Sequence, residues 1–193
     1  MRFGDGEKNI INNIACNRQG FSYDPGDCKD REFQNDLIES LEYMDDNYFV
    51  GINDERLEKR VNGTIISPMI FVNENYLPFL NKIIPLCNNC VLVANERGNR
   101  DTLPFEVLDY VKIKNTYWRY VDSLLVDVSI SYLLFDKPTQ IVLVAGGPWS
   151  NVLIQRFWET NKNHIYIDIG STLDPFLYRH NTRQYQERLK NDT

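Results

Sequence analysis

The sequence predicts an α/β fold: a single domain with a Rossmann-like, mostly parallel sheet that is flanked by helices. Short apolar runs of strand type alternate with longer amphipathic segments of helix type along the chain. The 193 residues are enough for one domain with a substantial core, and they are few for two domains. No apolar stretch reaches the roughly 18 residues that a membrane-spanning helix needs, so we expect no membrane span.

In the first half of the chain we expect two helices and two strands. Residues 31–44 form the first helical pattern, and Asp30 is its candidate N-cap. Residues 74–84 form the second helical pattern, which Pro85 ends. The strands are 48–52 and 91–94, the latter of buried type. The apolar faces of the two helices comprise Phe33, Leu37, Leu41 and Met44 in the first, and Leu77, Leu80 and Ile84 in the second.

The second half continues the alternation. Residues 103–110 are expected to form a short helix with Pro104 in its first turn, followed by a strand at 111–113. Residues 120–135 favour a helix, although their pattern also fits a strand. The further elements that we expect are a strand at 141–145, a helix at 150–160, a strand at 165–169 and a charged tail that frays from about residue 186.

Charge and cysteine content narrow the functional classes. The net charge of −6 argues against a nucleic-acid partner, because binding to phosphate backbones needs a basic face. Cys87 and Cys90 form one CxxC without a second pair of ligands, which favours plain thiols over a zinc site. We therefore expect a cytoplasmic protein, or one in the host cytoplasm if the chain is viral.

Ligands of parallel α/β sheets bind beyond the carboxyl ends of the strands. The segments there are 4–7, 95–99, 146–150 and 168–174. In the first, Asp5 and Glu7 can converge on Mg²⁺ or Mn²⁺ if Gly4 and Gly6 let the backbone turn. The alternative is a loop with two solvated acids.

The other segments suit a phosphorylated ligand, and each also has a purely structural interpretation. Gly146 and Gly147 allow a ligand to approach the backbone, and Ser150 is a candidate cap or phosphate ligand for the helix that follows. Asp168 is a candidate catalytic acid, Asn95 a candidate sugar or base ligand, and Arg119 a candidate phosphate ligand. Tight turns, solvated loops and packing aromatics explain the same residues without a ligand.

The opening Arg2-Phe3-Gly4-Asp5-Gly6-Glu7 resembles the signature of the GT-D-fold glycosyltransferases, which carry a DxE motif. Later segments resemble that family in the same order along the chain. They are Phe49-Val50-Gly51-Ile52, Val144-Ala145-Gly146-Gly147-Pro148, Ile167-Asp168-Ile169-Gly170-Ser171, Leu173-Asp174-Pro175, and Arg183 with Tyr185.

The resemblance implies a metal-dependent transferase that moves a sugar, with glucose preferred, from a UDP-sugar to a hydroxyl of a glycan or glycoprotein. It assigns Asp5 and Glu7 to Mn²⁺ or Mg²⁺ and to the diphosphate, together with Arg2, Gly4 and Gly6. It also places the loop 146–148, which ends in Pro148, in the nucleotide cleft. The alternative is a non-catalytic nucleotide-sugar-binding module. Residues 1–193 are then one glycosyltransferase-like domain, either complete or cut from a longer chain.

Overall fold

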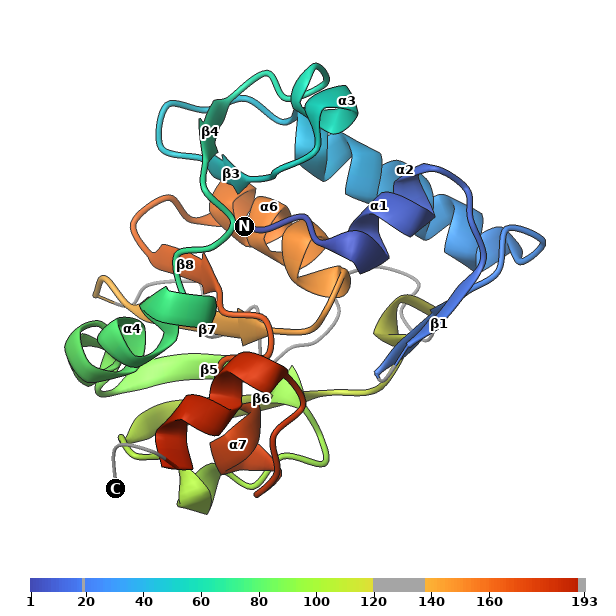
Figure 1. Cartoon of the computed structure of the whole chain (residues 1–193). Helices are drawn as coiled ribbons and strands as arrows, with labels where there is room; N and C mark the ends of the chain where they lie inside the picture. The colour runs from blue at the N-terminus through green and yellow to red at the C-terminus, as the bar shows by residue number, and fades with distance from the viewer. Residues whose placement is uncertain (19, 120–137, 191–193) are drawn as a thin grey trace.

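A four-stranded, fully parallel sheet forms the centre of the computed structural model, which describes residues 1–18, 20–119 and 138–190 (Figure 1). Its strand order is β6-β5-β7-β8. The strands are β5 (Cys90–Asn95), β6 (Val107–Ile113), β7 (Ile141–Ala145) and β8 (Ile165–Asp168). The parallel sheet confirms the predicted fold class.

Two further strand pairs lie outside this sheet. The pair of β3 (Phe49–Gly51) and β4 (Thr64–Ile66) is parallel, whereas β1 (Cys16–Arg18) and β2 (Phe21–Tyr23) form an antiparallel hairpin. The sequence predicted a strand at 48–52, which β3 confirms.

The α-helices are α1 (Asp5–Ile11), α2 (Cys28–Glu42), α3 (Glu55–Glu58), α4 (Tyr76–Lys82), α6 (Trp149–Thr160) and α7 (Asp174–Leu177). Short 3-10 helices connect them: η1 (Asn73–Asn75), η2 (Ile84–Cys87), η3 (Arg100–Thr102), η4 (Tyr117–Arg119) and η6 (Gln184–Lys190). Helix α6 confirms the predicted helix at 150–160, and α4 confirms the central part of the one predicted at 74–84.

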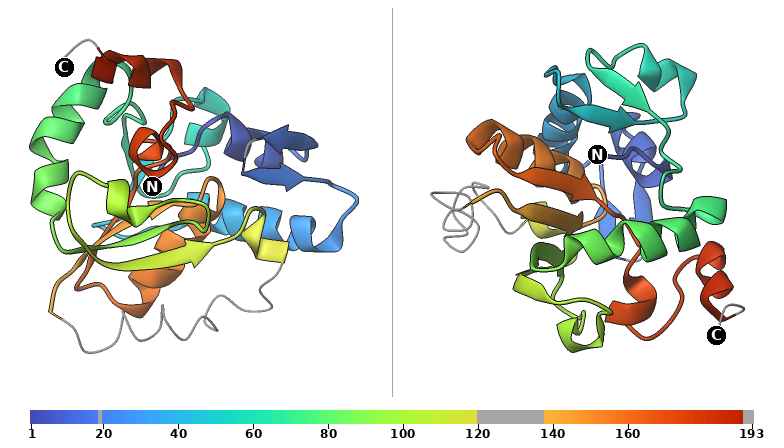
Figure 2. Two further views of the ribbon diagram at one scale, coloured as in Figure 1. Left: turned by 90° about the horizontal axis from the view of Figure 1, so that it is seen from below. Right: turned by 90° about the vertical axis from the view of Figure 1, so that its left-hand side faces the viewer.

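The sheet separates two hydrophobic cores, because successive side chains of a strand point to opposite faces. Val91 and Val93 of β5 pack into the core beneath α1, α2 and α6. Leu92 and Ala94 pack into the other core, beneath α4, α7 and η6. The two helical layers cover opposite faces of the sheet (Figure 2).

Helix α2 begins three residues earlier than the sequence predicted. Asp27, and not Asp30, is the N-cap, since its carboxylate accepts the N–H groups of Lys29 and Asp30. Phe33 and Leu37 are buried as expected, but Met44 lies beyond the helix end and is 72% exposed. The apolar pattern predicted the helix correctly and its ends incorrectly.

The helix predicted at 103–110 is wrong, because Val107–Ile113 forms strand β6. Its backbone pairs in parallel with β5 from Cys90 to Asn95. Residues such as Val107 and Tyr110 fit a pleated surface well, and the hydrogen bonds of the neighbouring strand outweigh a weak local helix pattern.

Two further expectations concern residues 120–135 and the charged tail. The predicted helix at 120–135 lies outside the described residues. The tail holds together further than expected, because Gln186 is fully buried within η6 and its side chain donates to the Ser171 carbonyl at 2.5 Å.

In the part of the chain that the structure describes, no helix has the length and apolar character of a membrane span. All four cysteines are free thiols. Cys87 and Cys90 are buried, and burial raises the pKa of the Cys90 thiol to about 12. Such thiols are inert at neutral pH.

Asp30 ties α2 to η4 from a fully buried position. Its carboxylate accepts the Asp24 N–H at 2.7 Å and the Trp118 Nε1–H at 2.8 Å, and it forms a two-point ion pair with the Arg119 guanidinium. Burial alone would raise the pKa of Asp30, but these hydrogen bonds outweigh it and the pKa is lowered. The buried carboxylate therefore accepts four hydrogen bonds, which come from Asp24, Trp118 and Arg119.

Replacing Asp30 by alanine should lower the free energy of unfolding by about 3–5 kcal/mol, because it leaves the Arg119 charge without its partner. Urea denaturation at pH 7 measures this loss. Asp36→Ala is the matched control: its ion pair with Arg156 is about one-third exposed on both sides, so it should cost less than about 1 kcal/mol.

The difference in the free energy of unfolding between wild type and Asp30→Ala should also depend on pH. A carboxyl group whose pKa is lowered by folding stabilises the folded state at pH values above its unfolded pKa of about 4. This stabilisation is lost as the pH falls through the folded pKa. Equal losses for Asp30→Ala and Asp36→Ala would contradict the assigned role of the buried pair.

Candidate active site at the carboxyl edge of the sheet

The first three residues bridge β3 and β8. The Phe3 N–H donates to the Gly51 carbonyl at 2.8 Å, and the Gly51 N–H donates to the Met1 carbonyl at 2.9 Å. The segment runs parallel to β3, with Arg2 opposite Gly51. The N-terminus therefore lies between β3 and β8 (Figures 1 and 2).

Two buried side chains hold the backbone of Arg2 from the other side. Asn151 of α6 accepts the Arg2 N–H at 3.2 Å and donates to the Arg2 carbonyl at 3.0 Å. Asp168, at the end of β8, accepts the same N–H at 3.1 Å, and its other oxygen accepts the Gly170 N–H at 2.9 Å. Sequence reasoning missed Asn151, which the structure shows to be a fully buried amide. The signal in the sequence was an amide directly before the apolar run 152–154.

The Arg2 side chain lies over the Phe71 ring, with 5.1 Å from its guanidinium carbon to the ring centroid. Its Nη2 lies against the backbone of Gly170. Its Nε is buried and has no hydrogen-bond partner. Among the described residues, no ion pair within 4.0 Å and no hydrogen bond engages this guanidinium. A half-buried guanidinium with free donors is suited to bind an anion.

Asp5 and Glu7 begin helix α1 instead of forming a glycine turn. Gly4 is the N-cap with a φ of −100°, and Gly6 lies inside the helix, so neither glycine adopts the positive φ that we expected. Glu7 folds back and accepts the Gly4 N–H at 2.9 Å. Residues two apart on a helix point to roughly opposite sides, and Asp5 is exposed.

Burial raises the pKa of Glu7 and that of Asp168, and in both cases the positive charge of Arg2 partly offsets this effect. The negative charge of Asp168 adds to the rise at Glu7, which shows that the three groups share one electrostatic environment. The site thus combines two partly desolvated carboxylates with one guanidinium.

The ring of Phe21, at the tip of the β1–β2 hairpin, covers Gly6 and Gly147, which belong to two of the predicted ligand-binding segments. A Cβ on Gly6 would lie 2.6 Å from the ring, and one on Gly147 would lie 3.7 Å from it. Gly147 has a φ of +60° and so requires glycine for its turn. Pro148 next to it is the N-cap residue of α6. The hairpin therefore brings the 4–7 and 146–148 segments under one aromatic cover.

Other predicted ligands have protein partners. Ser150 accepts the Gly146 N–H at 2.8 Å instead of capping α6. The Asn95 amide donates to Asn115 at 2.6 Å, and its oxygen accepts the Arg97 N–H at 3.1 Å. The Arg119 guanidinium is bound to Asp30, as described above. The structure thus places Arg2, and not Arg119, with its guanidinium free at the strand ends.

The carboxyl-terminal segment completes the surroundings of Arg2. The Tyr185 and Ser171 hydroxyls are 3.0 Å apart. Burial raises the pKa of Tyr185, while the Ser171 hydrogen bond and the charge of Arg2 partly offset this rise. Burial raises the pKa of Asp174, and although a hydrogen bond from Thr182 opposes this rise, the resulting pKa is about 6. The pKa of Asp174 is therefore well above that of an ordinary carboxyl group.

No family model matches the sequence, and no curated protein matches it. Solved structures do. A structure described as a new glycosyltransferase (DUF1792) from Streptococcus sanguinis superposes with a TM-score of 0.60 at 15% identity, over 91% of this chain and 76% of that one. A structure of the domain of unknown function 1792, described as having a distinct glycosyltransferase fold, gives 0.58 at 16% identity, over 91% and 74%. The likeness shows that this chain has that fold.

Gly170→Ala should destabilise the protein more than Gly147→Ala, by up to about 1 kcal/mol, because the flexible end of Arg2 can shift away from the new Cβ. Both glycines have left-handed φ values, +49° and +60°, and share that strain. Only at Gly170 would the new Cβ overlap the Arg2 guanidinium. Urea denaturation of the two variants measures the difference. Equal losses would show that Arg2 is not packed against Gly170.

Proposed function

We propose that this protein is a glycosyltransferase that moves a sugar, with glucose preferred, from a UDP-sugar to a hydroxyl of a glycan or glycoprotein. The observation that carries the proposal is the free guanidinium of Arg2 at the carboxyl ends of parallel strands. Ligands of such sheets bind at that edge. The two solved neighbours described as glycosyltransferase or glycosyltransferase fold support the choice of reaction.

Arg2 would hold the diphosphate of the donor. A guanidinium can donate two parallel hydrogen bonds to phosphate oxygens. The Asn151 and Asp168 bonds to its backbone fix the position from which the side chain reaches the ligand. The Phe71 ring restrains the guanidinium from one face. These contacts place the positive charge before the ligand arrives, so little ordering is needed on binding.

The charge balance of the site fits a divalent cation. Asp5, Glu7 and Asp168 together outweigh Arg2, so a diphosphate needs further positive charge to bind there. The described residues contain no group of three metal-ligating side chains. Mg²⁺ commonly takes one or two protein carboxylates and completes its shell with water and substrate phosphates.

Because Asp5 and Glu7 point to roughly opposite sides of α1, we propose that the exposed Asp5 binds Mn²⁺ or Mg²⁺ directly and that Glu7 reaches the ion through water. When bound, the ion would neutralise charge on the leaving diphosphate. One Glu7 oxygen remains bound to the Gly4 N–H, which fixes the carboxylate at the helix start.

Transfer to a hydroxyl also requires a group that accepts the hydroxyl proton. Asp168 was one of the candidates that the sequence suggested, and both of its oxygens accept backbone N–H groups. That arrangement suits a residue that positions Arg2. Asp174, with a pKa of about 6, is the other described candidate for the base.

A non-catalytic nucleotide-sugar-binding module is the second candidate function. The observation that favours it is that both oxygens of Asp168 are bound to backbone N–H groups, because an anion site built on Arg2 works without a base. Turnover separates the two functions: an enzyme releases UDP from the donor, whereas a binding module retains the intact UDP-sugar.

Arg2→Ala should weaken UDP binding at least about tenfold, since a charge-assisted two-point contact is lost. Isothermal titration with UDP and Mn²⁺ measures this change. Arg2→Lys should recover only part of the affinity, because an ammonium group cannot make the planar contact. Arg100→Ala, at an exposed arginine on η3, is the control and should bind UDP like the wild type. Unchanged binding by Arg2→Ala would reject the assigned diphosphate site.

Asp5→Asn should abolish the Mn²⁺ dependence of UDP release while leaving the fold intact. The exposed Asp5 side chain has no structural partner among the described residues, so its replacement should not lower the melting temperature. UDP release from UDP-glucose, measured with Mn²⁺ and with a chelator, gives the comparison. Asp101→Asn, also exposed, should keep full metal-dependent release. Metal-dependent release by Asp5→Asn at the wild-type rate would contradict this metal assignment.

A further inference from the structure

Two surface segments beside the candidate site are joined by hydrogen bonds. The first, 96–102, follows β5, and the second, 178–183, follows α7. The Asn99 N–H donates to the Leu177 carbonyl at 3.0 Å, and the Thr102 hydroxyl donates to the Phe176 carbonyl at 2.6 Å. These bonds hold the two segments together, so side chains that are far apart in the sequence share one surface.

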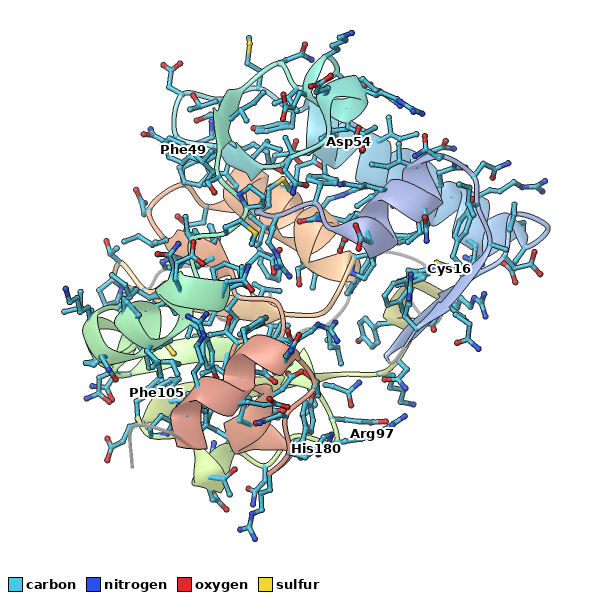
Figure 3. All side chains as sticks on the ribbon, viewed as in Figure 1. Cys16, Phe49, Asp54, Arg97, Phe105 and His180 are labelled. Atoms are coloured by element: carbon cyan, nitrogen blue, oxygen red, sulfur yellow. The ribbon has the colours of Figure 1, made fainter. Side chains whose placement is uncertain are left out.

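Both segments contribute exposed basic side chains, which together form what we call the basic surface. Arg97 comes from the first segment, and Arg179, His180 and Arg183 come from the second. Arg97 and His180 are labelled on the same side of the molecule in Figure 3. Residues 178–183 include no aspartate or glutamate, although the whole chain has a net charge of −6. The sign of this surface is therefore opposite to that of the protein as a whole.

The three arginines of the basic surface form no ion pair with any carboxylate in the described part of the chain. Arg60, Arg119 and Arg156, by contrast, each pair with a carboxylate of α2. Arg179 also has a φ of +59°, a conformation that is uncommon outside glycine and that occurs preferentially at functional sites. A guanidinium that no protein carboxylate engages can donate two parallel hydrogen bonds to the carboxylate of a ligand.

The basic surface borders Asp174, the candidate base. Burial raises the pKa of Asp174, and Arg183 and His180 are among the groups that oppose this rise. Burial also raises the pKa of Tyr178, to which the charge of Asp174 adds, whereas the charge of Arg97 opposes it. Because charges shift a pKa in this way when they lie nearby, the basic side chains surround the same carboxyl group. A ligand bound to them therefore lies next to Asp174.

We propose that the basic surface binds an acidic glycan and that such a glycan is the class of acceptor that this protein uses. The guanidinium groups pair with carboxylates of the acidic sugars, which holds a neighbouring hydroxyl beside Asp174. The role as acceptor rests on the proposed sugar transfer, whereas the binding of the glycan does not. A glycan is favoured over a nucleic acid, because the net charge of −6 repels a long polyanion beyond this small surface.

Hexagalacturonic acid, which carries a carboxylate on every sugar, is the probe, and maltohexaose is its neutral counterpart. Isothermal titration at low salt should show binding of hexagalacturonic acid and no binding of maltohexaose. Arg97→Glu combined with Arg179→Glu should weaken this binding at least about tenfold, because two attractive charges become repulsive. Hexagalacturonic acid should also speed UDP release from UDP-glucose, and equal rates with the two oligosaccharides would overturn the acceptor role.

Arg18→Glu combined with Arg56→Glu is the matched control, because both arginines are exposed, lie outside the basic surface and give the same change in net charge. This control should bind hexagalacturonic acid like the wild type. Equal weakening by the two double variants would overturn the proposal, since it would show that only net charge matters. Equal affinity for a single-stranded oligonucleotide with six phosphates would also overturn it, by assigning the surface to any polyanion.

UDP binding in the presence of Mn²⁺, measured on the same samples, separates this inference from the proposed function. Both double variants should bind UDP nearly like the wild type, since the donor site on Arg2 is intact in each. UDP binding without any binding of hexagalacturonic acid would overturn the acidic-glycan site and leave the donor site in place. Binding of hexagalacturonic acid without UDP binding would instead reject the transferase and support the basic surface as a glycan site.

Discussion

The hydrogen bonds that hold the backbone of Arg2 are the constraint on which the candidate site depends. Three elements that are distant in sequence meet there: β3 through Gly51, α6 through Asn151 and β8 through Asp168. Because these bonds are made to backbone atoms, they fix the path of the first residues whatever side chains follow. Helix α1, which begins at Asp5, and the side chain of Arg2 both take their positions from this junction.

Electrostatics at the junction sets what the site can bind. Burial makes the carboxylates of Glu7 and Asp168 harder to ionise, and the charge of Arg2 stabilises both of them, while the Met1 amine also stabilises that of Asp168. The guanidinium nevertheless keeps its donors free, because the carboxylate oxygens bond to backbone N–H groups. Backbone N–H groups thus hold the two carboxylates, whereas the Phe71 ring and Gly170 hold the Arg2 guanidinium. The charges of all three groups therefore remain available to a ligand and a cation.

Arg119, which the sequence suggested for phosphate, and Arg2, which the family resemblance assigned to the diphosphate, differ in their surroundings for a physical reason. Arg119 faces the fully buried Asp30, and a buried carboxylate without a partner would be very costly. Its guanidinium is therefore used within the fold. Arg2 faces glycine and an aromatic ring, neither of which satisfies its donors. Sequence pattern alone does not distinguish these surroundings, because Asp30 and Arg119 are 89 residues apart.

The sequence by itself determined the fold class, the buried strands β5 and β7 and the apolar face of α2, since these follow from local periodicity of apolar residues. It also determined which loops follow the strands and hence which segments lie at the carboxyl edge of the sheet. Tertiary structure alone decided that Val107–Ile113 is a strand, that Phe21 covers Gly6 and Gly147, and that Asn151 holds Arg2. Each of these depends on contacts between residues far apart in the chain, where the energy of pairing and burial exceeds local preference.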